Sequence, residues 1–431
     1  MPAAPDNGKP PETAVRRLAD DLFRRESGRL VSMLTGIFGI HRLELAEDVV
    51  QEALARALET WPYYGVPDNP PAWLMQTAKH LALDRIRRES RFRDKQPDII
   101  ADLKQRMRAE DRPNAAFDDE IRDDRLRLIF ACCHPTLPLE MQTALALKVL
   151  CGFGPQEIAR AFLASEAAVL KRLTRARGRL QADGVRFEIP AGPELTVRLD
   201  GVLATLYLLF NEGYKASEGD RIVRGELCRE AIRLTELLAA HPVAGQPRVH
   251  ALLSLMLLNA ARLPARTDAD GSILRLAEQD RRLWNRAMIQ RGIYHLDRAS
   301  SGDTLSAYHL QAGIAACHCL AADAASTDWH RILNLYDHLA EIDDSPVVAV
   351  NRAVAVARVH GPARAIRELE RRMEGSSLDR YYLTHAVLGE LEQRRDRHAA
   401  AAVHFLHALK LAEVAPERAL LERRLRECRK G

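Results

Sequence analysis

Apolar residues recur at intervals of three and four along most of the 431-residue chain, which is the spacing of amphipathic helices. No long segment alternates apolar and polar residues as a half-buried strand does. The pattern therefore predicts an all-α protein. In the second half of the chain, it predicts helices at 197–211, 225–240, 249–263, 273–290, 304–321 and 329–341.

The most distinctive stretch, residues 154–177, contains two short helical patterns separated by a turn. Pro155 suits the first position of a helix, where its missing N–H is not needed. Ser165, three residues before Ala168, suits the N-cap of the second helix. Leu163 stands in the turn, where glycine is more usual. This spacing predicts a helix-turn-helix.

The second helix of this stretch combines an apolar face with a basic one. Val169 and Leu173 recur at helical spacing and are predicted to face the core. The opposite face suits a helix that lies in the DNA major groove among phosphates. It consists of Lys171, Arg172, Arg175, Arg177 and Arg179. A solvated surface helix is the alternative interpretation.

Residues 45–58 are predicted to form a helix with a polar stripe. Asp48, Gln51 and Glu52 lie at i, i+3 and i+4 and therefore share one face. An ordinary surface helix has the same pattern. The dipeptide Trp61-Pro62 is expected to end the helix, and 63–71 is expected to form a loop.

The next predicted helix, 72–89, begins with an aromatic residue and ends in arginines. Trp73 lies near its start, and Arg85, Arg87 and Arg88 lie near its end. Aromatic side chains beside basic ones suit unstacked bases with a phosphate backbone alongside. A core position is the alternative for Trp73.

In their order and separation, these three features resemble a bacterial sigma factor of the extracytoplasmic-function type, in the sigma-70 family. The resemblance covers roughly residues 12–185. It implies a sigma domain 2 at 12–90, a linker at 91–125 and a sigma domain 4 with the helix-turn-helix at 126–185. It also implies binding to core RNA polymerase, to the β′ clamp through Asp48, Gln51 and Glu52, and to the β flap.

The resemblance further implies two sets of contacts with promoter DNA. The −10 element would be captured and melted by Tyr63, Asn69, Trp73, Thr77, Lys79, His80, Arg85, Arg87 and Arg88. The −35 element would be bound as duplex by Ser165, Ala168, Lys171, Arg172, Thr174, Arg175 and Arg177.

The linker changes from basic to acidic along its length. A solvated tether explains this composition. As in the linkers of sigma factors, the acidic part could instead mimic RNA in the exit channel of the polymerase. Beyond the linker, Cys132, Cys133 and His134 are consecutive and lack a second pair at ligand spacing, so a packed helix end is predicted rather than a metal site. No metal or cofactor is expected.

Pro190 to Pro193 is expected to mark a domain boundary, followed by a helical domain at 194–431. Near its end, Ala353, Ala365 and Leu369 are followed 36 residues later by Gly389, Ala401 and Phe405. This period resembles a tetratricopeptide repeat, whose stacks form concave surfaces for protein partners. The stretch Asn211-Glu212-Gly213-Tyr214 is expected to be a structural turn.

Composition limits the remaining classes. The formal net charge of +4 is too small to identify a partner by itself. Seven cysteines fit no disulfide spacing, and neither a signal peptide nor an apolar run of 18 residues occurs. A cytoplasmic protein without a membrane span is therefore expected.

The sequence favours a non-enzymatic sigma factor, regulated or supported by its C-terminal repeat domain. The alternative is a ligand- or protein-sensing helix-turn-helix regulator with a repeat sensor domain. The polar stripe at 48–52 and the separate aromatic helix argue against that alternative, because an operator-binding protein needs neither. An enzyme is disfavoured because no nucleophile–base or metal constellation occurs.

Overall fold

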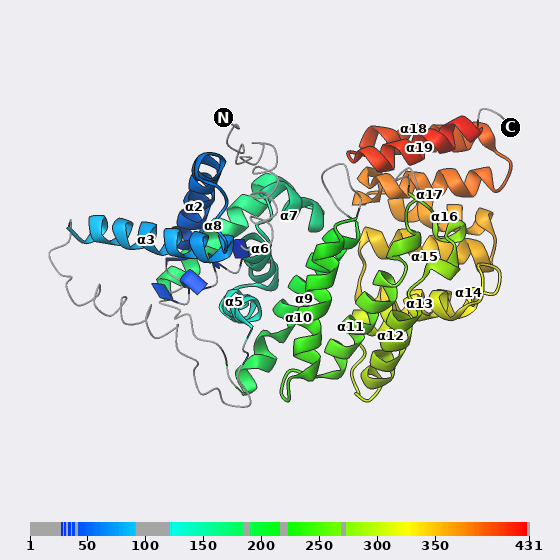
Figure 1. The fold of residues 1–431 in the computed structure, drawn as a ribbon. Coiled ribbons are helices and arrows are strands. Elements are labelled where there is room, and N and C mark those ends of the chain that lie inside the picture. Colours follow the sequence, from blue (N-terminus) through cyan, green and yellow to red (C-terminus); the bar gives the residue numbers. More distant parts are fainter. Residues whose placement is uncertain are drawn as a thin grey trace, which may run out of the picture. The chain divides into compact units, whose positions relative to one another are not determined.

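In the computed structural model, the described residues are 27–28, 30–31, 33–35, 37–38, 42–91, 121, 123–183, 190, 192–215, 223–268 and 273–428. Helices dominate these residues (Figure 1). Among the described residues, an isolated antiparallel β-bridge joins Thr267 and Ile273. The all-α prediction is confirmed. None of the described helices combines the length and apolarity that a membrane span requires. The acidic linker residues 92–120 and the start of the expected domain 2 lie outside the described residues.

Contacts divide the chain into two compact units, Met1–Thr205 and Leu206–Gly431. The division falls within α9, which spans Pro193–Tyr214. The helices that precede α9 are α2 (Leu43–Tyr64), α3 (Pro70–Arg91), α5 (Asp124–Cys132), α6 (Leu139–Cys151), α7 (Pro155–Ala161) and α8 (Glu166–Ala182).

Helices α2 and α3, blue in Figure 1, pack against each other. The expectation that Trp61-Pro62 ends the first of them is wrong. Pro62 lies in the last turn of α2, which continues to Tyr64 and stops at Gly65 with a φ of 85°. Trp61 is buried, so its packing holds the chain in a helix past the proline.

The predicted helix-turn-helix is confirmed as α7 and α8. The Ser165 hydroxyl accepts a hydrogen bond from the backbone N–H of Ala168 at 3.3 Å and caps α8. Ile158 in α7 and Val169 and Leu173 in α8 are buried, as the spacing predicted. Leu163 makes the turn with a φ of 49°, in the left-handed region that favours glycine.

Within the first unit, α5, α6 and the start of α9 share a core. Cys132 and Cys133 at the end of α5 are fully buried, which confirms the predicted packed helix end. Burial raises the pKa of the Cys133 thiol to about 12. Arg198 of α9 donates to the Phe130 carbonyl oxygen at 3.2 Å. A Cβ on Gly201 would lie 2.9 Å from Cys133 Sγ, so glycine permits this close packing.

The second unit continues from α9 through paired helices. They are α10 (Gly225–Ala240), α11 (Pro247–Ala260), α12 (Arg286–Ala299), α13 (Ala307–Leu320), α14 (Trp329–Ile342), α15 (Pro346–Val359), α16 (Pro362–Met373), α17 (Tyr382–Gln393), α18 (His398–Leu411) and α19 (Ala415–Cys428). Short 3₁₀ turns lie between them: η2 (Leu263–Ala265), η3 (Leu276–Glu278), η4 (Arg281–Leu283) and η5 (Ser377–Arg380).

Two local expectations in this unit are wrong. The helix expected at 273–290 is replaced by η3, η4 and the start of α12. The side chains of Asp280 and Asn285 accept hydrogen bonds from backbone N–H groups two and three residues on, which starts η4 and then α12. The expected turn at Asn211–Tyr214 is helical and forms the end of α9.

The predicted repeat near the C-terminus corresponds to two helix pairs. Ala353 lies in α15, and Ala365 and Leu369 lie in α16; Gly389 lies in α17, and Ala401 and Phe405 lie in α18. All six positions are buried. A Cβ on Gly389 would lie 2.8 Å from the Phe405 ring, so the aromatic side chain fills the space that the small residue leaves.

Candidate polymerase and promoter interface

The polar stripe of α2 is held by an arginine from α3. Arg85 Nη1 lies 3.0 Å from Asp48 Oδ2, and Arg85 Nη2 lies 2.9 Å from Glu52 Oε2. Hydrogen bonding to Glu52, more than to Asp48, raises the pKa of the Arg85 guanidinium. Gln51 is exposed next to this pair. Arg85, which the sequence assigns to promoter DNA, therefore links Asp48 and Glu52, which the sequence assigns to the polymerase.

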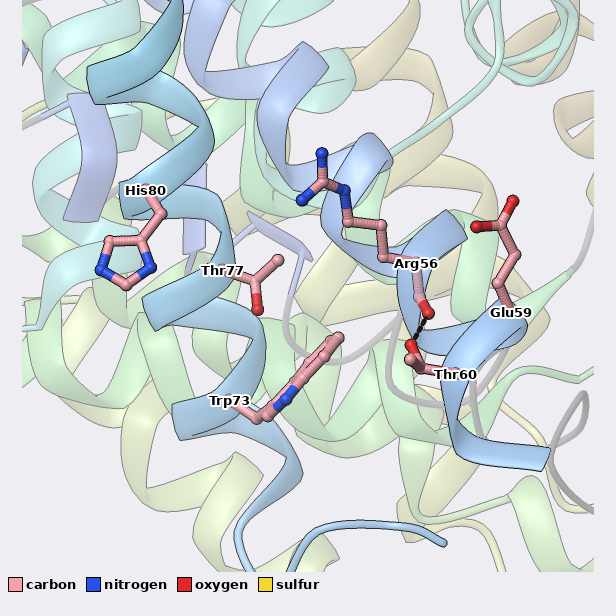
Figure 2. A pocket seen from close by; sticks show the side chains of 6 residues that line it. All are labelled: Arg56, Glu59, Thr60, Trp73, Thr77 and His80. Carbon is pink, nitrogen blue, oxygen red and sulfur yellow. Dashed lines mark hydrogen bonds between the residues drawn. The ribbon is translucent and has the colours of Figure 1, made fainter. Parts of the chain in front are cut away.

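A pocket of about 480 Å³ lies between α2 and α3. Figure 2 shows its lining, with Trp73, Thr77 and His80 on α3 and Arg56, Glu59 and Thr60 on α2. Trp73 is partly exposed and meets the buried Trp61 edge to face, with ring centroids 5.5 Å apart. The pocket thus offers one aromatic face, a cation and several hydrogen-bonding groups at the surface.

The sequence prediction included the α3 side of this pocket and missed Arg56, Glu59 and Thr60. These three share one face of α2 at helical spacing, one turn beyond Glu52. This helical spacing is the sequence signal that could have identified the three residues. It does not suffice alone, because the sequence does not show which face of α2 packs against α3.

The remaining residues expected at the −10 element differ in exposure. Tyr63, at the end of α2, is 71% exposed. Asn69 caps α3, because its side-chain oxygen accepts from the Ala72 N–H at 3.2 Å. Lys79 is buried, whereas Arg87 and Arg88 are exposed at the end of α3. His80 is exposed and contacts Gln76 at 3.0 Å.

The basic face of α8 contains two kinds of side chain. Lys171 and Arg175 are exposed and have no ion-pair partner among the residues that the structure describes. Arg172, by contrast, lies 2.7 Å from Glu140 of α6 and over the Phe162 ring. The exposed part of the face also includes Ser165 and Thr174, and Ala168 is partly buried beside it.

Arg177 is the second basic residue of α8 that already has acidic partners. Its guanidinium lies 2.5 Å from Glu47 Oε2 and 3.6 Å from Glu44 Oε1, both on α2. Burial raises the pKa of Glu47 and outweighs the opposing attraction to Arg177. Sequence spacing could not reveal this pair, because its members are 130 residues apart.

No group of three or more His, Cys, Asp or Glu side chains suited to a metal ion occurs within the described ranges.

Two models of known families match the part of the chain that contains these residues. Residues 22–92 match sigma-70 region 2, and residues 127–180 match sigma-70 region 4. The chain belongs to the sigma-70 family, as a sigma factor of the extracytoplasmic-function type with a fused C-terminal domain. Such proteins bind core RNA polymerase and promoter DNA and initiate transcription.

The rest of the chain has relatives without a known role. Residues 198–300 match a family of unknown function, DUF6596. An uncharacterized protein of Rhizobium meliloti (strain 1021) is 41% identical over 385 residues, which cover 89% of this chain and 90% of that protein. No solved structure is significantly similar to the chain.

Proposed function

We propose that this sigma factor recognises promoters through two surfaces, the α2–α3 pocket for the −10 element and the exposed face of α8 for the −35 element. One observation supports this division most directly. The pocket presents a partly exposed tryptophan ring next to Arg56, whereas α8 presents Lys171 and Arg175, which have no ion-pair partner among the described residues. The first combination suits unstacked bases, and the second suits duplex DNA.

In this proposal the two surfaces act at different stages. Contacts of Lys171 and Arg175 with the −35 duplex fix the register of the protein on DNA. An unpaired −10 base then stacks on Trp73, while Arg56 and His80 lie near its edge and phosphate. Binding the unstacked form offsets part of the cost of melting, which is a few kcal/mol per base. Tyr63 lies at the end of α2 and extends the aromatic surface.

Docking on the polymerase is assigned to Asp48, Gln51 and Glu52, with the β′ clamp as the partner, and region 4 is assigned to the β flap. Arg85 orients Asp48 and Glu52 from the inner side of the stripe. A Gln51→Ala, Glu52→Lys double variant is expected to weaken core binding more than tenfold, or by about 1.4 kcal/mol. Arg85→Gln is the comparison variant: it breaks ion pairs to Asp48 and Glu52 but keeps the three docking residues, so it should weaken core binding less than the double variant does.

Run-off transcription with purified core polymerase tests the whole assignment. The full chain should direct initiation from a cognate promoter, and the docking double variant should not. A helix-turn-helix regulator that acts at an operator would bind DNA without any core-dependent transcript. That result, together with unchanged core affinity in the double variant, would reject the assignment.

A second experiment separates the two DNA surfaces. Lys171→Ala and Arg175→Ala should each weaken −35 duplex binding and, where the side chain contacts phosphate, reduce the salt slope by about 1. Tyr63→Ala should leave duplex binding intact and slow promoter opening, followed by permanganate footprinting. Normal opening in the Tyr63 variant and in Trp73→Ala would remove the −10 role from this surface.

A further inference from the structure

Two arginines of the second unit, Arg262 and Arg266, flank η2. Arg262 follows α11, and Arg266 follows η2. The Nε atoms of both are buried and lack a hydrogen-bond partner. As whole residues, Arg262 and Arg266 are partly exposed. The Arg262 side chain donates a hydrogen bond to the neutral side-chain oxygen of Asn259.

Other arginines with a buried, unbonded Nε differ in one respect. Arg177, Arg198, Arg224 and Arg275 have a carboxylate at their terminal nitrogens, from Glu47, Glu194, Glu212 and Glu390 respectively. Arg262 and Arg266 have none among the described residues. Glu417, which lies in the same region, is bound to Lys215 at 2.7 Å and accepts a hydrogen bond from the Tyr382 hydroxyl.

Tyr214, at the end of α9, lies against this pair of charges. The Arg266 guanidinium carbon lies 3.8 Å from the centroid of the Tyr214 ring. Burial would raise the pKa of Tyr214, but the charges of Arg262 and Arg266, together with a hydrogen bond from Arg266, outweigh it and lower that pKa. Both guanidinium charges therefore lie close enough to the Tyr214 hydroxyl to affect its ionisation. The stretch at 211–214, expected from sequence to be a structural turn, contributes to this cluster.

Arg281 shows what a purely structural arginine looks like in the same unit. Its guanidinium donates to the carbonyl oxygens of His318 and Ala321 at 2.8 and 2.6 Å. These lie at the C-terminus of α13, where the helix dipole is negative and stabilises a cation. Arg281 thus has compensating partners at the negative end of a helix, whereas the contacts of Arg266 are with the ring and hydroxyl of the uncharged Tyr214.

Partly buried positive charges without a counter-ion are unfavourable, and two of them side by side also repel each other. We propose that Arg262 and Arg266, beside Tyr214, form a binding site for an oxyanion, the carboxylate or phosphate group of a small ligand. Guanidinium N–H groups match the paired oxygens of either group, and a dianion would neutralise both charges. The site is formed by other residues than the proposed polymerase and promoter surfaces and would allow a metabolite to act on the C-terminal domain.

Thermal unfolding of the full chain at constant ionic strength tests this site. Inorganic phosphate and acetate are each titrated against chloride, so that the two arms separate phosphate from carboxylate recognition. The midpoint should rise and saturate with at least one of them, because an anion that binds only the folded state stabilises it. Arg262→Gln and Arg266→Gln should each weaken the apparent affinity at least tenfold. Arg367→Gln, an exposed arginine of α16, is the control and should leave the response unchanged.

The outcomes decide the proposal whether or not the variants fold equally well. In chloride alone the two glutamine variants should unfold no earlier than the unmodified chain, because each removes an unpaired charge. Absence of a saturable rise with both anions in the unmodified chain would overturn the site. So would a rise of equal size in all three variants, since that would indicate binding elsewhere.

Discussion

At the scale of single residues, the turn between α7 and α8 depends on a leucine in an unfavourable conformation. Leu163 has a φ of 49° and is 55% exposed, so burial of its side chain does little to offset the backbone strain. Leu163→Gly should raise the free energy of unfolding by about 1 kcal/mol, because the left-handed region costs a non-glycine residue roughly that much. Chemical denaturation of the two proteins measures this difference in the free energy of unfolding.

The neighbouring Ala164 provides the control for this prediction. Its φ is not in the left-handed region, so Ala164→Gly should be neutral or destabilising by up to about 1 kcal/mol. If both glycine variants lost stability equally, the turn at Leu163 would not be strained.

What the sequence revealed at this scale was local chemistry. The Ser165 cap and the unusual Leu163 depend on neighbours within a few positions, so their residue types suffice to identify them. The partners of Arg172 and Arg177 were not predictable, because Glu140 and Glu47 belong to other helices. Five basic residues on one α8 face look equivalent in the sequence, and only the fold separates the paired ones from the exposed ones.

At the scale of elements, the contact between α11 and α12 includes two stacked histidines. His250 and His295 lie with their Nδ1 atoms 3.0 Å apart, and a Cβ on Gly292 would lie 2.8 Å from Leu258, so the helices are close. Burial, together with the charges of His250, Arg291 and Arg298, lowers the pKa of His295 to about 4.

This contact should weaken in acid. His295 in the unfolded chain takes up its proton near the ordinary value of 6.5, and in the folded chain only near 4. The free energy of unfolding should therefore fall as the pH drops from about 6.5 to 4. The slope from this residue should stay below about 1.4 kcal/mol per pH unit, because solvent partly screens the half-exposed ring.

His295→Phe, which keeps a flat ring against His250, should reduce that slope when unfolding is followed across the same pH window. His330→Gln, at an exposed position of α14, is the matched control and should leave it unchanged. Identical slopes for the two variants would place the acid sensitivity elsewhere.

The ends of helices could be predicted from the sequence where the apolar periodicity was strong. The predictions were wrong where capping side chains or tertiary contacts determine the end of a helix. Helix α10 spans the predicted residues. The helix predicted at 273–290 is wrong because the side chains of Asp280 and Asn285 cap new helical turns and so compete with one continuous helix. Helix α2 passes Pro62 because burial of Trp61 outweighs one missing hydrogen bond. Neither effect is visible in apolar spacing alone.

At the scale of the whole molecule, helix α9 determines how much of the C-terminal part of the chain can be removed without exposing the core of the first unit. Its first half packs on α5 and α6 through Arg198 and Gly201. A chain ending at Gly184 would expose the buried face around Phe130 and Cys133. Such a chain should be less stable and should support less run-off transcription than the full chain, which favours an activating or supporting C-terminal domain. Stronger transcription from the shortened chain would indicate autoinhibition.

A point variant tests the same packing without removing the domain. In Gly201→Val the new Cβ would lie 2.2 Å from Gln142 Oε1 and 2.9 Å from Cys133 Sγ, so overpacking should cost about 1–3 kcal/mol. Transcription should fall with stability. Val197→Ala, at a position of α9 that is 65% exposed, is the control and should behave like the unmodified chain.

The edge-to-face pair of Trp61 and Trp73 also gives the protein an optical reporter. One indole is buried and the other lines the α2–α3 pocket, so a base stacked on Trp73, as proposed, should quench part of the fluorescence. Trp284 and Trp329, in the second unit, would supply a constant background. Promoter melting should therefore be observable in stopped-flow experiments without a dye, and Trp73→Phe should abolish the signal.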